Sequence, residues 1–183
     1  MGLMVMPREA DLSLRSAHEF VRPRVLWPPD PEDGLPVALL LWDRDSVHDV
    51  AEALCVEGGV VVLALRTTDV DVATIALEWA GDHAGLLGAD PDQLLVAGGG
   101  LAAQTALHAR DEGWPPLARQ LLFGPERSGW PAADAQLAGA APATTVDAPM
   151  YAARLRDAGV EVEELPLAAP MSFEWAAPLL ASR

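Results

Sequence analysis

Short apolar runs alternate with longer segments of helical periodicity along most of this chain. Residues 37–42 and 60–65 are continuously apolar, which is typical of strands buried on both faces of a sheet. Strands that alternate with helices form a mostly parallel sheet covered by helices on both faces. With right-handed crossovers, the pattern predicts a doubly wound, three-layer α/β sandwich with six to eight strands. The predicted strands are residues 20–27, 37–42, 60–65, 94–97, 120–123, 144–146 and 160–167, the first of them at the sheet edge.

Helical patterns fill the segments between these strands. We expect helices over residues 45–58, 69–85, 101–110 and 148–158, and a closing helix that carries Phe173, Trp175 and Leu179. Residues 1–18 show no clear period and are expected to form an N-terminal arm. Residues 19–183 contain no linker and no internal repeat, so they are expected to form one domain.

The N-terminus lacks the apolar core of a signal peptide, and no run of about 18 apolar residues occurs. We therefore expect a cytoplasmic protein with no membrane contact. The net charge is −15, and all 12 positive charges are arginines. Because nucleic-acid affinity depends on neutralising phosphates with cations, nucleic acid is a poor candidate partner. The absence of lysine excludes Schiff-base chemistry and a P-loop.

Cysteine and histidine usage predicts neither a metal site nor a cofactor. The single cysteine, Cys55, lies in an apolar stretch and is expected to be a buried, inert thiol. The four histidines stand singly, without the paired spacing of zinc ligands. They are His18, His48, His83 and His108.

Six stretches carry a more specific signal in their order and spacing: residues 22–29, 35–37, 76–79, 88–98, 115–118 and 151–160. Examples are Gly-Ala-Asp-Pro-Asp-Gln-Leu-Leu-Val-Ala-Gly over 88–98 and Tyr-Ala-Ala-Arg-Leu-Arg-Asp-Ala-Gly-Val over 151–160. Together they resemble the hormone-sensitive-lipase-like branch of the α/β-hydrolases, from about residue 20 to the C-terminus. The resemblance implies a reduced α/β-hydrolase fold and an ancestral esterase chemistry.

The catalytic positions depart from that family's pattern. The family places its nucleophilic serine in Gly-Asp-Ser-Ala-Gly-Gly, on a sharp turn between a strand and a helix. Residues 98–103 here read Gly-Gly-Gly-Leu-Ala-Ala, so Gly100 occupies the serine position. Ser172 falls at or near the position of the histidine base, and no histidine follows His108. Asp147 is the candidate for the acid.

The oxyanion loop differs as well. The family pattern His-Gly-Gly-Gly supplies backbone N–H groups to the developing oxyanion. Here the corresponding stretch is Trp-Asp-Arg-Asp, and its carboxylates would oppose that charge. The cap that the family places between residues 123 and 146 is expected to be mostly absent. The predicted remnant pocket consists of Trp42, Asp43, Arg44, Asp45, Gly99, Gly100 and Leu101.

These losses favour a catalytically inactive esterase-like protein that acts as an interaction or structural subunit. We expect a homo-oligomer or a heteromer that pairs through the last strand. Alternatively, the remnant pocket binds a small molecule, or Asp43, Arg44 and Asp45 supply new acid–base chemistry. Gly98-x-Gly100-x-x-Ala103 also fits a loose dinucleotide fingerprint, with Glu126 as a possible ribose contact. A relocated Ser46–His48 dyad is disfavoured, since positions i and i+2 of a helix point apart.

Overall fold

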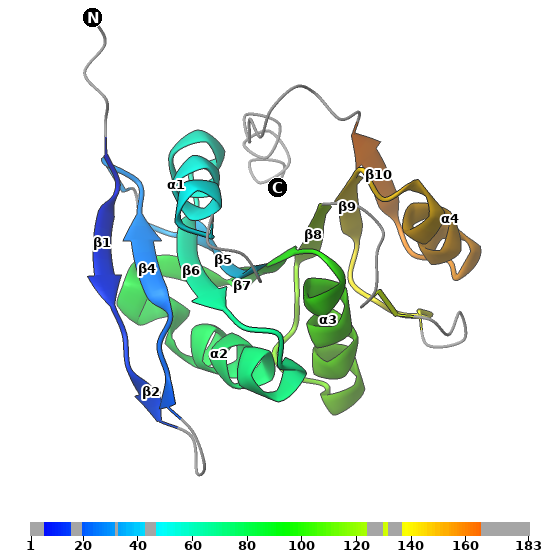
Figure 1. Ribbon diagram of the computed structural model, residues 1–183, viewed down its shortest axis with the longest axis horizontal. Coiled ribbons are helices and arrows are strands. Elements are labelled where there is room, and N and C mark those ends of the chain that lie inside the picture. Colours follow the sequence, from blue (N-terminus) through cyan, green and yellow to red (C-terminus); the bar gives the residue numbers. More distant parts are fainter. Residues whose placement is uncertain are drawn as a thin grey trace, which may run out of the picture.

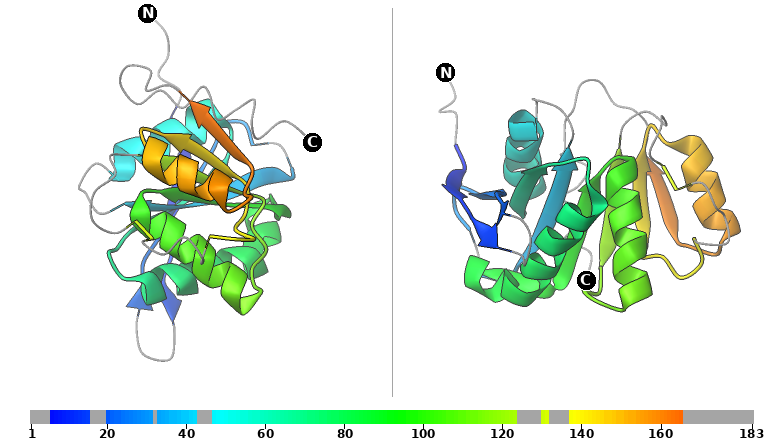
Figure 2. Two further views of the ribbon diagram at one scale, coloured as in Figure 1. Left: turned by 90° about the vertical axis from the view of Figure 1, so that its right-hand side faces the viewer. Right: turned by 60° about the horizontal axis from the view of Figure 1, so that its bottom comes forward.

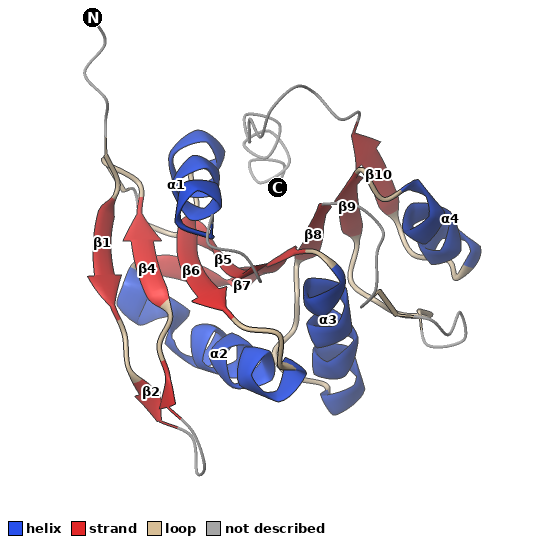
Figure 3. Cartoon of the chain, in the orientation of Figure 1, coloured by secondary structure: helices blue, strands red, loops and turns tan. Residues whose placement is uncertain are grey.

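A mixed eight-stranded sheet runs through the middle of the computed structural model (Figures 1 and 3). The structure describes residues 6–15, 20–31, 33–42, 47–123, 130–131 and 137–165. The strand order is β1-β4-β6-β5-β7-β8-β9-β10. The strands from β6 to β10 are mutually parallel, whereas β4 is antiparallel to both β6 and β1. The strands are β1 (Arg8–Asp11), β4 (Arg24–Trp27), β5 (Leu35–Trp42), β6 (Val61–Arg66), β7 (Ala89–Gly98), β8 (Arg119–Phe123), β9 (Ala143–Val146) and β10 (Val162–Leu165).

Helices cover both faces of this sheet, which confirms the predicted three-layer α/β sandwich. On one face, α1 (Val47–Gly58) packs on the even-numbered side chains of β5 and β6. On the other, α2 (Val70–His83), α3 (Gly100–Glu112) and α4 (Pro149–Asp157) form the second layer. Figure 2 shows α2 and α3 side by side on that layer. None of the helices that the structure describes is long and apolar enough to cross a membrane.

Local signals explain where the helices begin and end. The Asp69 carboxylate caps α2 by accepting a hydrogen bond of 2.8 Å from the Asp71 N–H, as the sequence predicts. Behind α2, a 3₁₀ turn (η1, Ala84–Leu87) ends at Gly88, whose φ of +73° is left-handed. The three helices of the second layer, α2, α3 and α4, begin and end close to the bounds predicted from the sequence.

Three stretches of the sheet differ from the sequence-based prediction. The edge strand expected over residues 20–27 is interrupted, and its second part, β4, lies one strand inside the edge. Residues 8–11, expected in a loose arm, form β1 and pair with β4. All four are exposed, so no apolar alternation marked this strand. In addition, β7 begins at Ala89, earlier than predicted. Residues 89–98 are all extended, although the sequence Asp90-Pro91-Asp92 is typical of a turn. A small two-stranded sheet joins β2 (Leu14–Arg15) to β3 (Phe20–Val21). The predicted closing helix lies outside the described residues.

Candidate functional site

The turn between β7 and α3 is the place where a hydrolase of this fold would carry its nucleophile. Gly98 ends β7 with a φ of +138°, and a Cβ there would lie only 2.3 Å from the carbonyl oxygen of Leu41. Gly99 follows as the N-cap residue of α3, with a φ of −94°. Gly100 is already the first residue of the helix. The strained, close-packed position is therefore Gly98, and Gly100 has ordinary helical geometry.

Two aromatic rings meet across this turn. Trp42 ends β5 and Phe123 ends β8, the strands on either side of β7. Their ring centroids are 5.3 Å apart, with an angle of 35° between the ring planes. Since β5 and β8 are separated by two strand spacings, about 9.6 Å, the rings must lean toward each other over β7. Gly99 lies beside Phe123: a Cβ built on it would make an ordinary van der Waals contact of 3.7 Å with the Phe123 carbonyl oxygen.

Trp42 was predicted to line a remnant pocket, together with Gly99, Gly100 and Leu101. The structure brings Trp42 to the end of β7 beside Gly99, and Leu101 follows in the first turn of α3. Sequence reasoning did not single out Phe123. Its only signal was its position at the end of a parallel strand next to a glycine-rich turn. Asp43, Arg44, Asp45 and Ser172 lie outside the described residues, as do Ser46 and Glu126.

Asp147, the candidate acid, directly follows β9 at the same edge of the sheet as the turn. The register Gly98↔Leu122 and Phe123↔Val146 places β7, β8 and β9 with their carboxyl ends together. Asp147 is exposed and has a left-handed φ of 59°, which aspartate adopts more readily than most residues. The predicted acid therefore lies at the expected end of its strand.

His48 has a different partner from the one considered in the sequence. It lies in the first turn of α1, and its Nε2 is 3.2 Å from the Glu52 carboxylate one turn later. Both side chains are partly exposed. This i,i+4 pair on the helix surface accounts for His48 without a role in catalysis.

Cys55 is the buried thiol that the sequence predicts. It lies in α1 with no exposed surface, against the sheet. Burial, with a smaller contribution from the Glu52 carboxylate, raises the pKa of the Cys55 thiol to about 12. Because the thiolate is the nucleophile, this group is unsuited to covalent catalysis.

Comparisons in sequence point to one kind of protein. No established family model matches the chain. Carboxylesterase NlhH of Mycobacterium tuberculosis is 35% identical over 122 residues, which cover 56% of this chain and 38% of the relative. Esterase LipI of the same organism is 27% identical over 140 residues, or 64% of this chain and 44% of the relative. The chain thus spans about two fifths of the length of these relatives.

Solved esterase structures share the fold. A thermostable esterase from Pseudomonas putida superposes with a TM-score of 0.75 at 20% identity, covering 98% of this chain and 81% of that one. A hyperthermophilic esterase from Pyrobaculum calidifontis gives 0.75 at 20% identity, covering 96% and 84%. The bacterial heroin esterase gives 0.73 at 23% identity, covering 100% and 80%. The sequence similarity and the shared fold together make the chain a relative of esterases with the α/β-hydrolase fold.

Proposed function

We propose that this chain is a catalytically inactive esterase-like protein that acts as an interaction or structural subunit. One observation carries the proposal: Gly100, at the position of the family's nucleophile, has no side chain and begins a regular helix. Acyl transfer requires a side-chain nucleophile that stands clear of the turn and is activated by a base. Ser172 at the position of the base cannot take that role at neutral pH.

The aromatic pair supports the same proposal. Trp42 and Phe123 lie over the end of β7, beside the place where a substrate carbonyl would approach a nucleophile at residue 100. Their contact leaves less room for a small molecule in the remnant pocket. An interaction role needs no pocket.

Purified protein is expected to hydrolyse p-nitrophenyl butyrate no faster than buffer. It is also expected to remain unlabelled by a fluorophosphonate probe, because no activated serine is present. An active carboxylesterase assayed in parallel serves as the positive control. Steady-state absorbance and in-gel fluorescence provide the two measurements.

Gly100→Ser is the informative variant. Turnover is expected to stay at the background rate, because one restored hydroxyl has neither a base nor an oxyanion hole. Turnover by the unmodified chain, or probe labelling at Ser172, would contradict the proposal. Strong rescue by Gly100→Ser would show that the remaining catalytic groups are intact.

The outer edge of β10 is the best-supported contact surface. Among the described strands, β10 pairs only with β9, and no described strand lies along its other edge. Its acidic side chains are paired within the chain: Glu163 with Arg119 at 3.9 Å, and Glu164 with Arg156. An open edge with neutralised charges is a template for pairing with another strand.

Light scattering at tens of micromolar is expected to give the mass of a dimer, or a heteromer when the native partner is present. Leu165→Asp, at the end of β10, is expected to convert a dimer to monomer. Leu165 is half-buried. Leu86→Asp is the control for the leucine-to-aspartate change, since Leu86 is 81% exposed and lies in η1 on another part of the molecule. A monomer that also finds no partner in pull-downs would make small-molecule binding the better explanation.

A further inference from the structure

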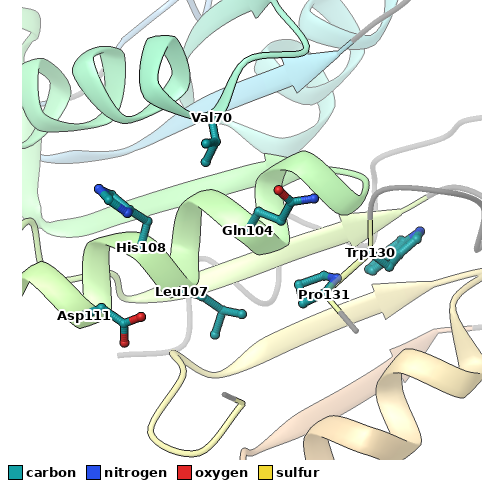
Figure 4. Close-up of a pocket in the computed structure, with 7 residues that line it drawn as sticks. All are labelled: Val70, Gln104, Leu107, His108, Asp111, Trp130 and Pro131. Atoms are coloured by element: carbon teal, nitrogen blue, oxygen red, sulfur yellow. The ribbon is translucent and has the colours of Figure 1, made fainter. Parts of the chain in front are cut away.

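A second pocket lies on the outer flank of α3, apart from the turn at Gly98–Gly100. Its volume is about 380 Å³, within the range of small-molecule sites. Figure 4 shows its walls: α3 forms the floor, the first residue of α2 the opposite side, and the segment at Trp130 one end. The lining residues are Val70, Gln104, Leu107, His108, Asp111, Trp130 and Pro131.

The lining combines apolar side chains with polar ones, and the polar Gln104 lies on the side of Trp130 and Pro131 (Figure 4). Trp130 and Pro131 supply apolar surface at that end, with Leu107 beside them on α3. Trp130 is held in place by Tyr151, whose ring centroid is 4.7 Å away. His108 and Asp111, one helical turn apart, form a polar end. A ligand that fills both ends needs an apolar or aromatic body and a polar head.

The charges beside the pocket are mixed: Arg154 donates to the Pro131 carbonyl oxygen at 2.7 Å, and the carboxylates lie at the other end. Asp111 is the one lining residue with a formal charge at neutral pH. Arg110 binds it from the side, with both Nε and Nη2 on the same oxygen, Oδ1, so that Oδ2 can accept from a ligand. Across the pocket, Asp69 and Asp71 flank Val70 at the start of α2. With a net charge of −15 on the chain, an anionic head group would be repelled.

We propose that this pocket binds a small organic cation: an ammonium head at Asp111 and His108, joined to an apolar or aromatic body that packs on Trp130. The site shares no residue with the turn between β7 and α3. The proposal therefore stands or falls independently of the inactive-esterase proposal.

Three phenyl-bearing probes of similar size and different charge test the class of ligand. Phenethylamine, 2-phenylethanol and 3-phenylpropionate are titrated into the ¹⁵N-labelled full chain. The indole N–H of Trp130 and the side-chain amide of Gln104 report on the pocket, with Trp130→Phe to assign the indole signal. Phenethylamine is expected to bind saturably, at least tenfold more tightly than 3-phenylpropionate, with the alcohol between them.

Asp111→Asn is expected to weaken phenethylamine about threefold to fivefold, the effect of one exposed ion pair, and to leave 2-phenylethanol unchanged. Glu112→Gln removes the neighbouring exposed carboxylate, which does not line the pocket, and is expected to change neither. Val70→Trp fills the pocket from α2 and is expected to abolish binding of all three probes.

Three results would overturn the proposal. They are equal affinity for the three probes, no shift at Trp130 or Gln104 with any probe at tens of millimolar, and shifts that map to Trp42 and Phe123 instead.

Discussion

Replacing Gly98 with alanine is expected to destabilise the fold by at least about 3 kcal/mol. Two costs combine at this position. The φ of +138° is one that L-residues rarely adopt, and the added Cβ would meet the Leu41 carbonyl oxygen at 2.3 Å. That oxygen belongs to the central strand β5, which cannot move without disturbing its pairing with β6 and β7. For a chain of this size, the loss corresponds to a decrease in Tm of about 6–12 °C.

Gly85→Ala is the matched control. Gly85 lies in the exposed turn η1, does not have a positive φ, and has no atom within 4 Å of a Cβ built on it. The same chemical change there is expected to be neutral or to stabilise by a few tenths of a kcal/mol. Urea denaturation followed by circular dichroism measures both variants. Equal stability of the two would show that the turn can relax and that the β5–β7 approach is looser than described.

Much of the fold could be predicted because its central strands are buried on both faces. Residues 37–42 and 60–65 are apolar without interruption, and the structure places them in β5 and β6 at the centre of the sheet. The strand β1 escaped prediction because its four residues, Arg-Glu-Ala-Asp, are all exposed. Its pairing depends on the edge that β4 offers, which is information that the local sequence does not hold.

The candidate site, like the fold, could be predicted from the sequence only in part. The glycine turn and Asp147 were predictable because the motif order places them at the carboxyl ends of particular strands. The contact between Trp42 and Phe123 was not, because it joins the ends of two strands that are separated by a third strand, β7. The proposed cation pocket could not be predicted from the sequence either. It joins Val70, one face of α3 and Trp130, three separate parts of the chain without a common motif.

Cys55 in the folded chain is expected to react with a thiol reagent about a thousandfold more slowly than in the chain unfolded by urea. Burial raises the pKa of this thiol from 9.0 to about 12, and each unit lowers the thiolate fraction near pH 8 tenfold. Tight packing in α1 against the sheet slows the reaction further, so labelling would require opening of the helix. Absorbance after addition of Ellman's reagent, with and without urea, gives the two rates.

Val56→Cys in a Cys55→Ser background provides the control, because Val56 is the next residue of the same helix and is 38% exposed. Its thiol is expected to react quickly without urea, and fast labelling of native Cys55 would instead mean that α1 is not packed as described.

The same burial makes the fold sensitive to alkali. The folded-state pKa values of Cys55 and Tyr151 are both raised, each to about 12, with burial the main cause. Below pH 9 both groups are protonated in folded and unfolded chains alike, and their contribution to stability is fully present. Between about pH 9 and 12 the unfolded chain releases protons that the folded chain retains, so the free energy of unfolding falls as pH rises. Cys55→Ala is expected to make that decline shallower.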